Sequence, residues 1–383
     1  MAFRHYLPTE IVFGVGCLDE LRERCRPLGQ KALVVTGTRS ARATGILDRV
    51  LAQLPGAAVF DEVEQNPGTA TCDRAAARCR EAGCDVVVAV GGGSPMDVAK
   101  AAAGLALNDG PCSAHFGADT FKLGSLPVVA VPTTAGTGSE VTPGAVIVDT
   151  DNGIKRTIKG SALFPRLALL DPELTLPLPR DITVNTGLDV LSQAAEGYVS
   201  KKAALMTDVL ALEAVRLVKS HLPRAAAHGD DLGARAGMLY ASLLSGCVIA
   251  QTGTTLVHGM GYYFTLECGV AHGLANALLL TPLFQHNAQY EPEKVAAVAA
   301  ALGCPSPPMP RDASGAIARA FHGLLAELDV SPAARDAGVD AERLRGFAEH
   351  IVGDPYRFRN QVGDVGLGDV LGFFEQAYEG RIR

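Results

Sequence analysis

Tryptophan is absent from this chain of 383 residues, and aromatic residues make up only 5% of it, so aliphatic side chains are expected to fill its cores. The nine cysteines are scattered and include no Cys-x-x-Cys pair. An odd number of cysteines without paired spacing favours reduced thiols in a cytoplasmic protein over a disulfide framework. The N-terminus also lacks the hydrophobic core of a signal peptide.

Basic residues are fewer than acidic ones, 34 against 41. The net charge is −7 and no stretch rich in lysine and arginine occurs, which argues against a nucleic-acid surface. The apolar stretches at residues 86–90 and 274–284 are too short or too interrupted to span a bilayer, so no membrane partner is expected. The chain is 48% apolar, which is enough for the two domains that its length predicts.

The two halves of the chain differ in pattern. In the first half, short apolar runs alternate with helical patterns, which predicts an α/β domain with a Rossmann-like, mostly parallel sheet over residues 1–178. Residues 149–153 resemble a hairpin turn, so an antiparallel excursion is expected there. After the proline-rich residues 172–180, Ala/Leu-rich helical periodicity predicts an all-α domain over residues 179–383, with a cleft at the junction.

The elements expected from these patterns are the following. The strands are residues 32–36, 57–60, 86–90, 128–131, 145–148 and 167–170. The helices are residues 41–53, 70–82, 96–106, 186–200, 204–220, 231–250, 270–286, 292–302, 312–327 and 341–351.

The most informative segment is GGGSPMDVAK at residues 91–100, directly after the apolar run 86–90. Ser94 is the expected N-cap of the following helix, Pro95 its first residue and Asp97 its capping-box partner. A strand, a glycine turn and a helix N-terminus together favour an anion, because the backbone can approach closely and free N–H groups face the ligand. The segment therefore predicts a phosphorylated cofactor, although a plain turn between strand and helix has the same pattern.

A second segment, PTTAGTGSE at residues 132–140, follows the expected strand 128–131 and carries several hydroxyls. The carboxyl edge of a doubly wound sheet is where ligands bind, so these hydroxyls are expected at the cofactor. In the helical half, Asp189 and Gln193 share a helix face, and His258 and His272 each precede a glycine. Spacing alone leaves open whether these four side chains form a divalent-metal site or are ordinary core and surface residues.

Taken together, these segments resemble the signatures of the iron-dependent (group III) alcohol dehydrogenases. The resemblance covers residues 6–380 in matching order and includes DPELT at residues 171–175, GLD at residues 187–189 and the two His-Gly segments. It implies a nicotinamide-binding α/β domain, a helical domain, a metal in the cleft and a homodimer or larger homo-oligomer. It also implies a metal-assisted, NAD(P)-dependent alcohol dehydrogenase or aldehyde reductase, whose cation polarises the oxygen of a small aldehyde.

The resemblance also assigns roles by position. It implies that Asp189, His258 and His272 are metal ligands, with Gln193 in the place of the fourth. The cofactor residues that it implies lie in four places along the chain. They are Gly92, Gly93, Ser94 and Asp97 at the pyrophosphate and its ribose, Thr133, Thr134 and Thr137 on the adenine and ribose side, Asn66 at the adenosine end, and Lys155 at the nicotinamide ribose.

Three positions depart from the family pattern. Gln193 replaces a histidine ligand, which weakens metal binding and leaves Fe(II) or Zn(II) open. Tyr262 replaces a second histidine beside the nicotinamide; it passes a proton as the catalytic residue or only shapes the pocket. Gly37 replaces the acidic residue that accepts from the ribose of NAD, so Thr38, Arg39 and Ser40 are expected to admit NADP, with Arg39 as a plain surface charge the alternative.

Several functions stay open at this point. Gln193 also fits a metal-free reductase resembling the maleylacetate reductases. A lyase resembling dehydroquinate synthase needs a basic site that the sequence does not show, and a binding protein without turnover is the remaining option. Lys159, Arg357 and Arg359 either recognise an anionic aldehyde carrying a phosphonate, sulfonate or carboxylate, or they are solvated surface charges.

Overall fold

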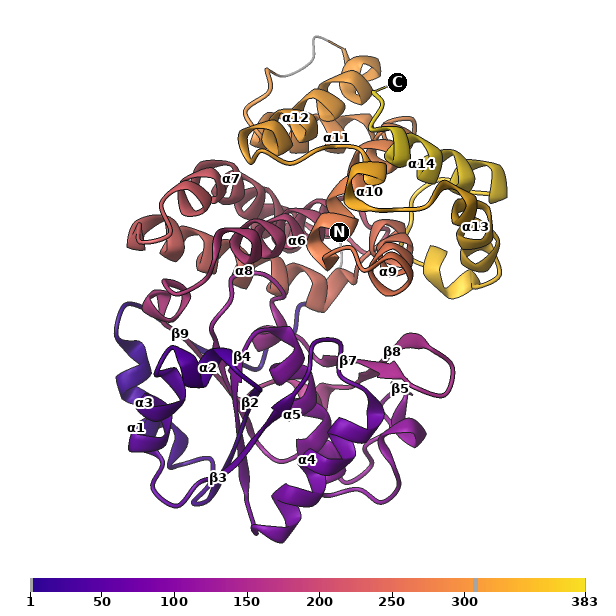
Figure 1. The fold of residues 1–383 in the computed structure, drawn as a ribbon. Coiled ribbons are helices and arrows are strands. Elements are labelled where there is room, and N and C mark those ends of the chain that lie inside the picture. The colour runs from indigo at the N-terminus through magenta and orange to yellow at the C-terminus, as the bar shows by residue number, and fades with distance from the viewer. Residues whose placement is uncertain (1–2, 306–308, 383) are drawn as a thin grey trace. The chain divides into compact units, whose positions relative to one another are not determined.

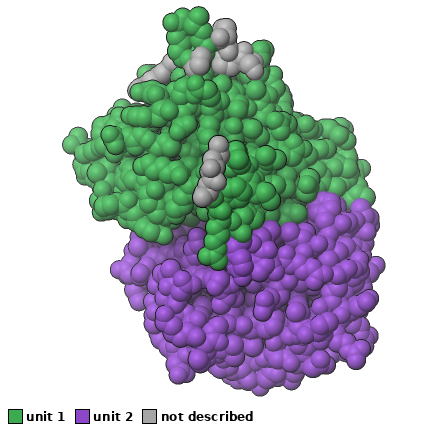
Figure 2. All heavy atoms as spheres, turned by 180° about the vertical axis from the view of Figure 1, so that it is seen from behind, with its two compact units in different colours: residues 1–5, 179–383 green, residues 6–178 purple. Residues whose placement is uncertain are grey.

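The computed structural model describes residues 3–305 and 309–382. The chain divides into two compact units, which Figure 2 shows in separate colours. Unit 1 comprises Met1–His5 and Pro179–Arg383, and unit 2 comprises Tyr6–Leu178. Each unit has its own core, and they are described in turn.

Unit 2 contains a six-stranded sheet in which every pairing is parallel (Figure 1). The strand order is β1-β9-β6-β4-β2-β3. Its strands are β1 (Glu10–Phe13), β2 (Ala32–Gly37), β3 (Ala58–Val63), β4 (Val86–Gly91), β6 (Val128–Pro132) and β9 (Leu167–Leu170). All residues of β4, β6 and β9 are buried, as expected of central parallel strands covered on both faces. The mostly parallel α/β domain predicted from the sequence is confirmed.

The helices of unit 2 correct two details of the sequence analysis. They are α1 (Leu21–Cys25), α2 (Ser40–Ala43), α3 (Ile46–Gln53), α4 (Thr69–Glu81) and α5 (Gly93–Leu105). The single helix predicted over residues 41–53 is wrong, because Gly45 adopts a left-handed φ of 73° between α2 and α3. The predicted cap of α5 is also wrong. Its N-cap is Gly92 and no side chain caps it, so Ser94 and Pro95 lie inside its first turn.

A smaller sheet completes unit 2. It contains β5 (Gly117–Ala118), β7 (Gly144–Asp149) and β8 (Ile154–Lys159) in the order β5-β8-β7. The β7 and β8 strands pair antiparallel around a turn at residues 150–153, which confirms the predicted hairpin.

Unit 1 is helical, and no strand occurs among its described residues. Its long helices are α6 (Arg180–Val199), α7 (Leu205–Ala227), α8 (Leu232–Thr252), α9 (Leu256–Cys268), α10 (His272–Asn287), α11 (Pro292–Ala301), α12 (Ala313–Glu327), α13 (Leu344–Val352) and α14 (Leu367–Glu379). The sequence analysis missed α9 and α14, each of which contains two internal glycines that lower helix propensity.

The α8 helix is the one described segment with the length and hydropathy of a membrane span. The sequence analysis overlooked it. In the structure, 67% of its most apolar window is buried, and it packs against α6 and α7. A helix that is apolar on every side is typical of the core of a large helical unit.

Glycine permits the close approach of α10 to α6. A Cβ atom added at Gly273 would overlap the backbone carbonyl oxygen of Asn185. The side chain of Asn185 also accepts a hydrogen bond from the backbone N–H of Leu274, at 3.0 Å. The first turn of α10 is therefore held directly against the first half of α6, where Asp189 lies.

We expect Gly273→Ala to lower the free energy of unfolding by about 1–3 kcal/mol, because a backbone atom cannot move aside as a flexible side chain would. The matched control is Gly323→Ala in α12, where an added Cβ meets nothing within 4 Å. That control is expected to raise stability by about 0.5–1 kcal/mol. Chemical denaturation of the two variants measures both effects, and equal stability of the two would contradict the packing described for α10.

Candidate functional site

Three potential metal ligands from three helices meet inside unit 1. Asp189 comes from the middle of α6, His258 from the first turn of α9, and His272 is the first residue of α10. One ligand atom from each lies within 4.8 Å of the other two. The structure thus brings together three of the four residues to which the sequence analysis assigned metal binding.

Asp189 lies at the centre of this cluster. Its Oδ1 is 3.3 Å from Nε2 of His258 and 3.9 Å from Nε2 of His272. Asp189 and His258 are buried, with 5% and 4% of their surface exposed, while His272 is partly exposed. The cluster thus offers one carboxylate and two imidazoles, and it is accessible to solvent at His272. This donor set suits Fe(II) or Zn(II).

The protonation of the cluster depends on a fourth side chain, Glu196, which contacts Nδ1 of His258. Burial alone would lower the pKa of His258, but the charges of Glu196 and Asp189 and their hydrogen bonds raise it to about 10. Burial would raise the pKa of Asp189, but the hydrogen bond from His258 and the charge of His272 hold it below its ordinary value. Two carboxylates therefore face His258, and one of them, Asp189, also lies 3.9 Å from His272. A divalent cation fits this environment.

Gln193 lies one turn after Asp189 and is buried. Its Nε2 donates to Asp189 Oδ2 at 2.9 Å, and its Oε1 accepts from the hydroxyl of Ser245 at 3.0 Å. The amide nitrogen, rather than the oxygen, faces the carboxylate in this arrangement. A role for Gln193 as metal ligand requires the two ends of its amide to exchange places.

Sequence reasoning missed Asn276, which is fully buried in α10. Its Nδ2 donates to Asp189 Oδ1 at 3.1 Å and lies 3.2 Å from His272 Nε2, while its Oδ1 has no hydrogen-bond partner. Asn276 stands one helical turn after His272 and so shares its face. That spacing was the available signal.

Tyr262 lies one turn after His258 in α9. Its ring stacks on that of His272 at a centroid distance of 5.4 Å and an interplanar angle of 12°. The phenol is thus beside the proposed ligands, and its catalytic role stays a prediction.

The three basic residues considered for anion recognition have different surroundings. Arg357 is engaged, because it donates to the carbonyl oxygen of Gly259 at 3.1 Å and lies 3.2 Å from Asp354. Arg359 is exposed, and its guanidinium lies 3.4 Å from the ring centroid of Tyr356. Partial desolvation lowers the pKa of Arg359, and Tyr262 is among the groups that act on it electrostatically. Lys159 is exposed at the end of β8 in unit 2.

The residues assigned to the pyrophosphate gather at the carboxyl edge of the large sheet in unit 2. Gly91 of β4 pairs with Pro132 of β6, and the backbone N–H of Thr133 donates to Gly91 at 3.0 Å. A Cβ atom on Gly92 would lie 3.1 Å from the hydroxyl of Thr134, and one on Gly93 would lie 2.8 Å from Cγ2 of Thr137. A side chain at either glycine would therefore force Thr134 or Thr137 to shift where the turn 133–138 packs on the start of α5. Ser94 is half-buried in the same first turn.

The other proposed cofactor residues also lie in unit 2. Gly37 is the last residue of β2, and Thr38, Arg39 and Ser40 after it are exposed. An added Cβ at Gly37 meets only ordinary contacts, the nearest at 3.6 Å, so packing does not forbid an acidic residue there. Asn66 follows β3 with a left-handed φ of 55°, a conformation that asparagine tolerates. Lys155 lies on β8, and its charge acts on Asp97.

A buried network that sequence reasoning missed connects α5 to the segment 132–140, for which cofactor binding is predicted. Lys100 donates to Ser139 Oγ at 2.7 Å, to Thr142 Oγ1 at 3.3 Å and to the carbonyl oxygen of Gly144 at 2.9 Å. Asp97 accepts from Ser139 Oγ at 2.8 Å and from the backbone N–H of Val146 at 3.0 Å. Asp97 thus binds this segment, and not Ser94 as the capping box predicted.

Burial shifts the pKa values of this network. Desolvation lowers the pKa of Lys100 to about 8, raises that of Glu140 to about 7 and raises that of Asp97. Glu140 is 1% exposed, and its Oε1 has no hydrogen-bond partner. Its charge is therefore costly to the folded protein at neutral pH.

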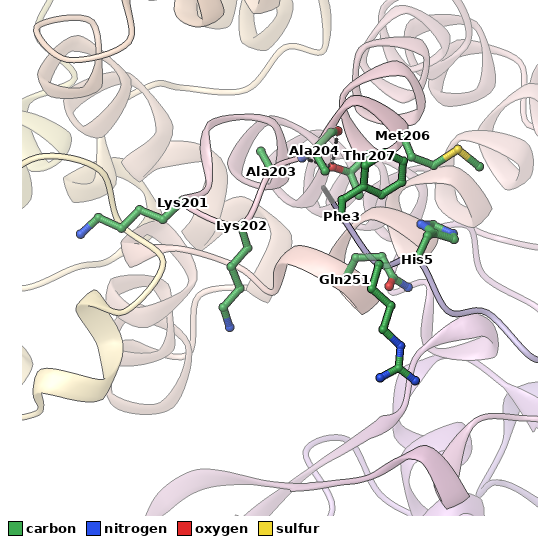
Figure 3. A pocket seen from close by; sticks show the side chains of 10 residues that line it. Phe3, His5, Lys201, Lys202, Ala203, Ala204, Met206, Thr207 and Gln251 are labelled. Carbon is green, nitrogen blue, oxygen red and sulfur yellow. Dashed lines mark hydrogen bonds between the residues drawn. The ribbon is translucent and has the colours of Figure 1, made fainter. Parts of the chain in front are cut away.

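Unit 1 also contains a cavity of about 400 Å³, away from the proposed ligands (Figure 3). Arg4, His5, Lys201 and Lys202 give it a basic lining, and none of its lining residues is acidic. The remaining lining residues are Phe3, Ala203, Ala204, Met206, Thr207 and Gln251. None of them belongs to the cluster around Asp189, so this cavity is not the candidate catalytic site.

Comparison with known proteins matches both units to one family. Residues 8–172 match the iron-containing alcohol dehydrogenase model, and residues 183–376 match the C-terminal model of the Fe-containing alcohol dehydrogenase family. The sulfoacetaldehyde reductase of Bilophila wadsworthia is 32% identical over 99% of this chain and 100% of its own length.

Two solved structures are similar over nearly the whole chain. A 1,3-propanediol oxidoreductase superposes with a TM-score of 0.94 and 33% identity, covering 98% of this chain and 100% of that one. The sulfoacetaldehyde reductase of Bifidobacterium kashiwanohense in complex with NAD+ has a TM-score of 0.88 and 31% identity, covering 99% of each chain.

The buried Glu140 makes stability depend on pH. Because its folded pKa lies above the ordinary value of 4.5, the folded protein retains a proton that the unfolded chain loses, and stability falls as pH rises from about 4.5 to 7. Glu140→Gln removes this loss. We expect the free energy of unfolding of the variant, measured by urea denaturation, to rise by about 2–3 kcal/mol relative to that of the wild type between pH 4.5 and 7.5. The exposed control Glu81→Gln is expected to gain nothing, and a pH-independent difference for Glu140→Gln would contradict the account.

Proposed function

The chain belongs to the iron-containing alcohol dehydrogenase family, and on that premise we propose that it is a metal-assisted, NAD(P)-dependent reductase of a small aldehyde, acting reversibly on the primary alcohol. That it is an oxidoreductase acting on CH–OH groups follows from the family and from the relatives named as dehydrogenases and reductases. The observation that carries the finer proposal is the convergence of Asp189, His258 and His272 in unit 1.

The side chains of the cluster would hold an Fe(II) or Zn(II) ion. When bound, the cation polarises the carbonyl oxygen and the reduced nicotinamide supplies the hydride. Asp189 would contribute the negative charge, and His258 of α9 and His272 of α10 would contribute ring nitrogens. Tyr262 would pass a proton to the substrate oxygen or order the water that does so, and its stacking on His272 supports this proposal.

The cofactor would be held by unit 2. Gly92 and Gly93 leave room for the pyrophosphate at the N-terminus of α5, and the hydroxyls of Thr133, Thr134 and Thr137 line the same edge. Ser94 and Asp97 would contact the neighbouring ribose, Asn66 the adenosine end and Lys155 the nicotinamide ribose. Asp97 would do so while its two oxygens also accept from Ser139 and Val146. We favour NADP slightly over NAD, because Gly37 offers no carboxylate to repel a 2′-phosphate and Arg39, Thr38 and Ser40 are exposed beside it.

An anionic aldehyde is the proposed substrate class. Arg359 belongs to the same unit as the ligands, and its electrostatic interaction with Tyr262 supports a position near the reacting group. A guanidinium binds a sulfonate, phosphonate or carboxylate through paired hydrogen bonds. The sulfoacetaldehyde reductases among the similar proteins are named for an aldehyde of this kind.

A metal-free reductase is the alternative that one observation favours. Gln193 turns its amide nitrogen toward Asp189, and this donor would have to give way to a cation. In that case the two histidines themselves would donate to the carbonyl oxygen of the substrate.

The assembly and compartment are also proposals. Leu205, Met206 and Val209 at the start of α7 are 56%, 47% and 70% exposed, which supports a homodimer or larger homo-oligomer that covers them. All nine cysteines are free, which supports a reducing cytoplasm.

Metal dependence tests the proposal directly. We expect the dialysed protein to retain one divalent metal ion per chain, and Asp189→Ala to lose both the metal and NAD(P)H oxidation with a panel of neutral and anionic aldehydes. Gln193→His is expected to raise metal affinity, by about tenfold or more, because imidazole is a stronger donor than an amide. Asp181→Ala, an exposed acidic position on the same helix, is the control that keeps the metal. Full activity of metal-depleted wild type would favour the metal-free alternative.

Cofactor choice is tested at Gly37. We expect Gly37→Asp to raise the KM for NADPH by about tenfold or more, since its carboxylate repels the 2′-phosphate, and to leave or lower the KM for NADH. The Arg39→Ala variant tests attraction of the 2′-phosphate separately from its repulsion. It should raise the KM for NADPH and leave the KM for NADH unchanged. If neither change alters the ratio of the two KM values, these residues do not contact the adenosine ribose.

A further inference from the structure

Glu196 is a buried carboxylate that the proposed mechanism does not use. It lies on α6, two turns after Asp189, and none of its surface is exposed. Its Oε1 accepts from the backbone N–H of Thr255 at 2.9 Å, from the hydroxyl of Thr255 at 2.7 Å and from the backbone N–H of His258 at 3.3 Å. Its Oε2 contacts Nδ1 of His258. Both oxygens are thus committed to the first turn of α9.

These contacts determine which ring nitrogen of His258 carries a proton. An ionised carboxylate only accepts hydrogen bonds, so Nδ1 of His258 must be the donor to Glu196. The other ring nitrogen, Nε2, then faces Asp189 Oδ1 at 3.3 Å. Since Glu196 holds the Nδ1 proton, Nε2 is the nitrogen that gives up its proton when a cation binds, and it then offers its lone pair to that cation.

We propose that Glu196 is a positioning residue that holds the proton of His258 on Nδ1, so that Nε2 is directed at the cluster as a metal-binding lone pair. This inference rests on the proposed function, because it presumes that the cluster binds a cation. It goes beyond that function by assigning a role to a residue that is not itself a ligand. Gln193 stands in the place of a third histidine, so only two imidazoles remain in the cluster. The orientation of each ring therefore contributes more to metal affinity than it would in a site with three histidines.

A structural role alone can be separated from this one by a near-isosteric substitution. In Glu196→Gln, the oxygen must stay where three donors converge, because the amide NH₂ group would oppose the N–H groups of Thr255 and His258 there. The amide nitrogen must then occupy the position of Oε2 and donate to Nδ1 of His258. The proton of the ring moves to Nε2, where it donates to Asp189. Every hydrogen bond is kept in this variant, but the lone pair faces away from the cluster.

The matched control is Thr255→Val. It removes the hydroxyl that donates to Glu196 Oε1 but leaves both backbone donors and the contact to Nδ1 in place. It is expected to lower thermal stability and to leave the ring of His258 and the affinity for metal close to those of the wild type.

The experiment compares wild type, Glu196→Gln and Thr255→Val in full-length, metal-stripped protein. Zn(II) affinity is measured by competition with a chromophoric chelator, and ring protonation by nitrogen-15 NMR with histidine labelling, in which His258→Asn assigns the signals. We expect Glu196→Gln to bind Zn(II) about 10–100-fold more weakly than wild type. Its Nδ1 should be unprotonated, whereas Nδ1 should be protonated in wild type and in Thr255→Val.

The outcomes are distinguishable. Equal Zn(II) affinity of wild type and Glu196→Gln, or an equal loss in both variants, would overturn the inference and leave the proposed function intact. If wild type binds no Zn(II), Fe(II) or other divalent ion, the proposed function fails, and the metal-directing role of Glu196 fails with it. If Glu196→Gln does not fold, an unprotonated Nδ1 in wild type would refute the inference and a protonated one would support it.

Discussion

One buried carboxylate, that of Asp189, joins the helices that form the candidate site. Asp189 is buried in α6, and its two oxygens accept hydrogen bonds from the side-chain amides of Gln193 and Asn276. Two imidazoles lie within 4 Å of it. A buried charge of this kind costs several kcal/mol unless it is paired. The charge of Asp189 can be balanced by protonated histidines or by a bound metal cation. Three ligand atoms within 4.8 Å of one another are compatible with both. The chemistry of the protein follows from which of the two holds that position.

The packing of α9 and α10 on α6 brings His258 and His272 to Asp189. Gly273 allows α10 to touch α6 at Asn185, which places His272 beside Asp189. Glu196 receives the first turn of α9 and thereby places His258. Unit 2 shows the same principle at Lys100, whose ammonium is fully buried and bonded to three oxygens that bring the segment 139–144 to α5. In both units, buried charges specify the position of backbone segments that carry the proposed functional residues.

The sequence predicts the architecture well where the physical signal is local. Apolar runs such as residues 86–90 and the turn at residues 149–153 gave the strands and the hairpin, because period and turn residues act over a few positions. Asp189, His258 and His272 are far apart in the chain, and only resemblance to a family joined them before the structure did. The start of α5 was misplaced because Gly92, and not the better capping residue Ser94, has the extended backbone of the cap. Lys100 and Glu196 were missed because their roles arise from contacts between elements, for which spacing along the chain carries no signal. Asn276 could have been found, because it follows His272 by one helical turn and shares its face.

The most direct test of the central claim is a crystal structure of the metal-loaded protein with anomalous diffraction recorded at the absorption edge of the bound metal. The account predicts a single anomalous peak per chain, coordinated by Asp189, by Nε2 of His258 and by His272. An anomalous peak bound elsewhere, or three side chains that remain bonded to one another at full metal concentration, would contradict it.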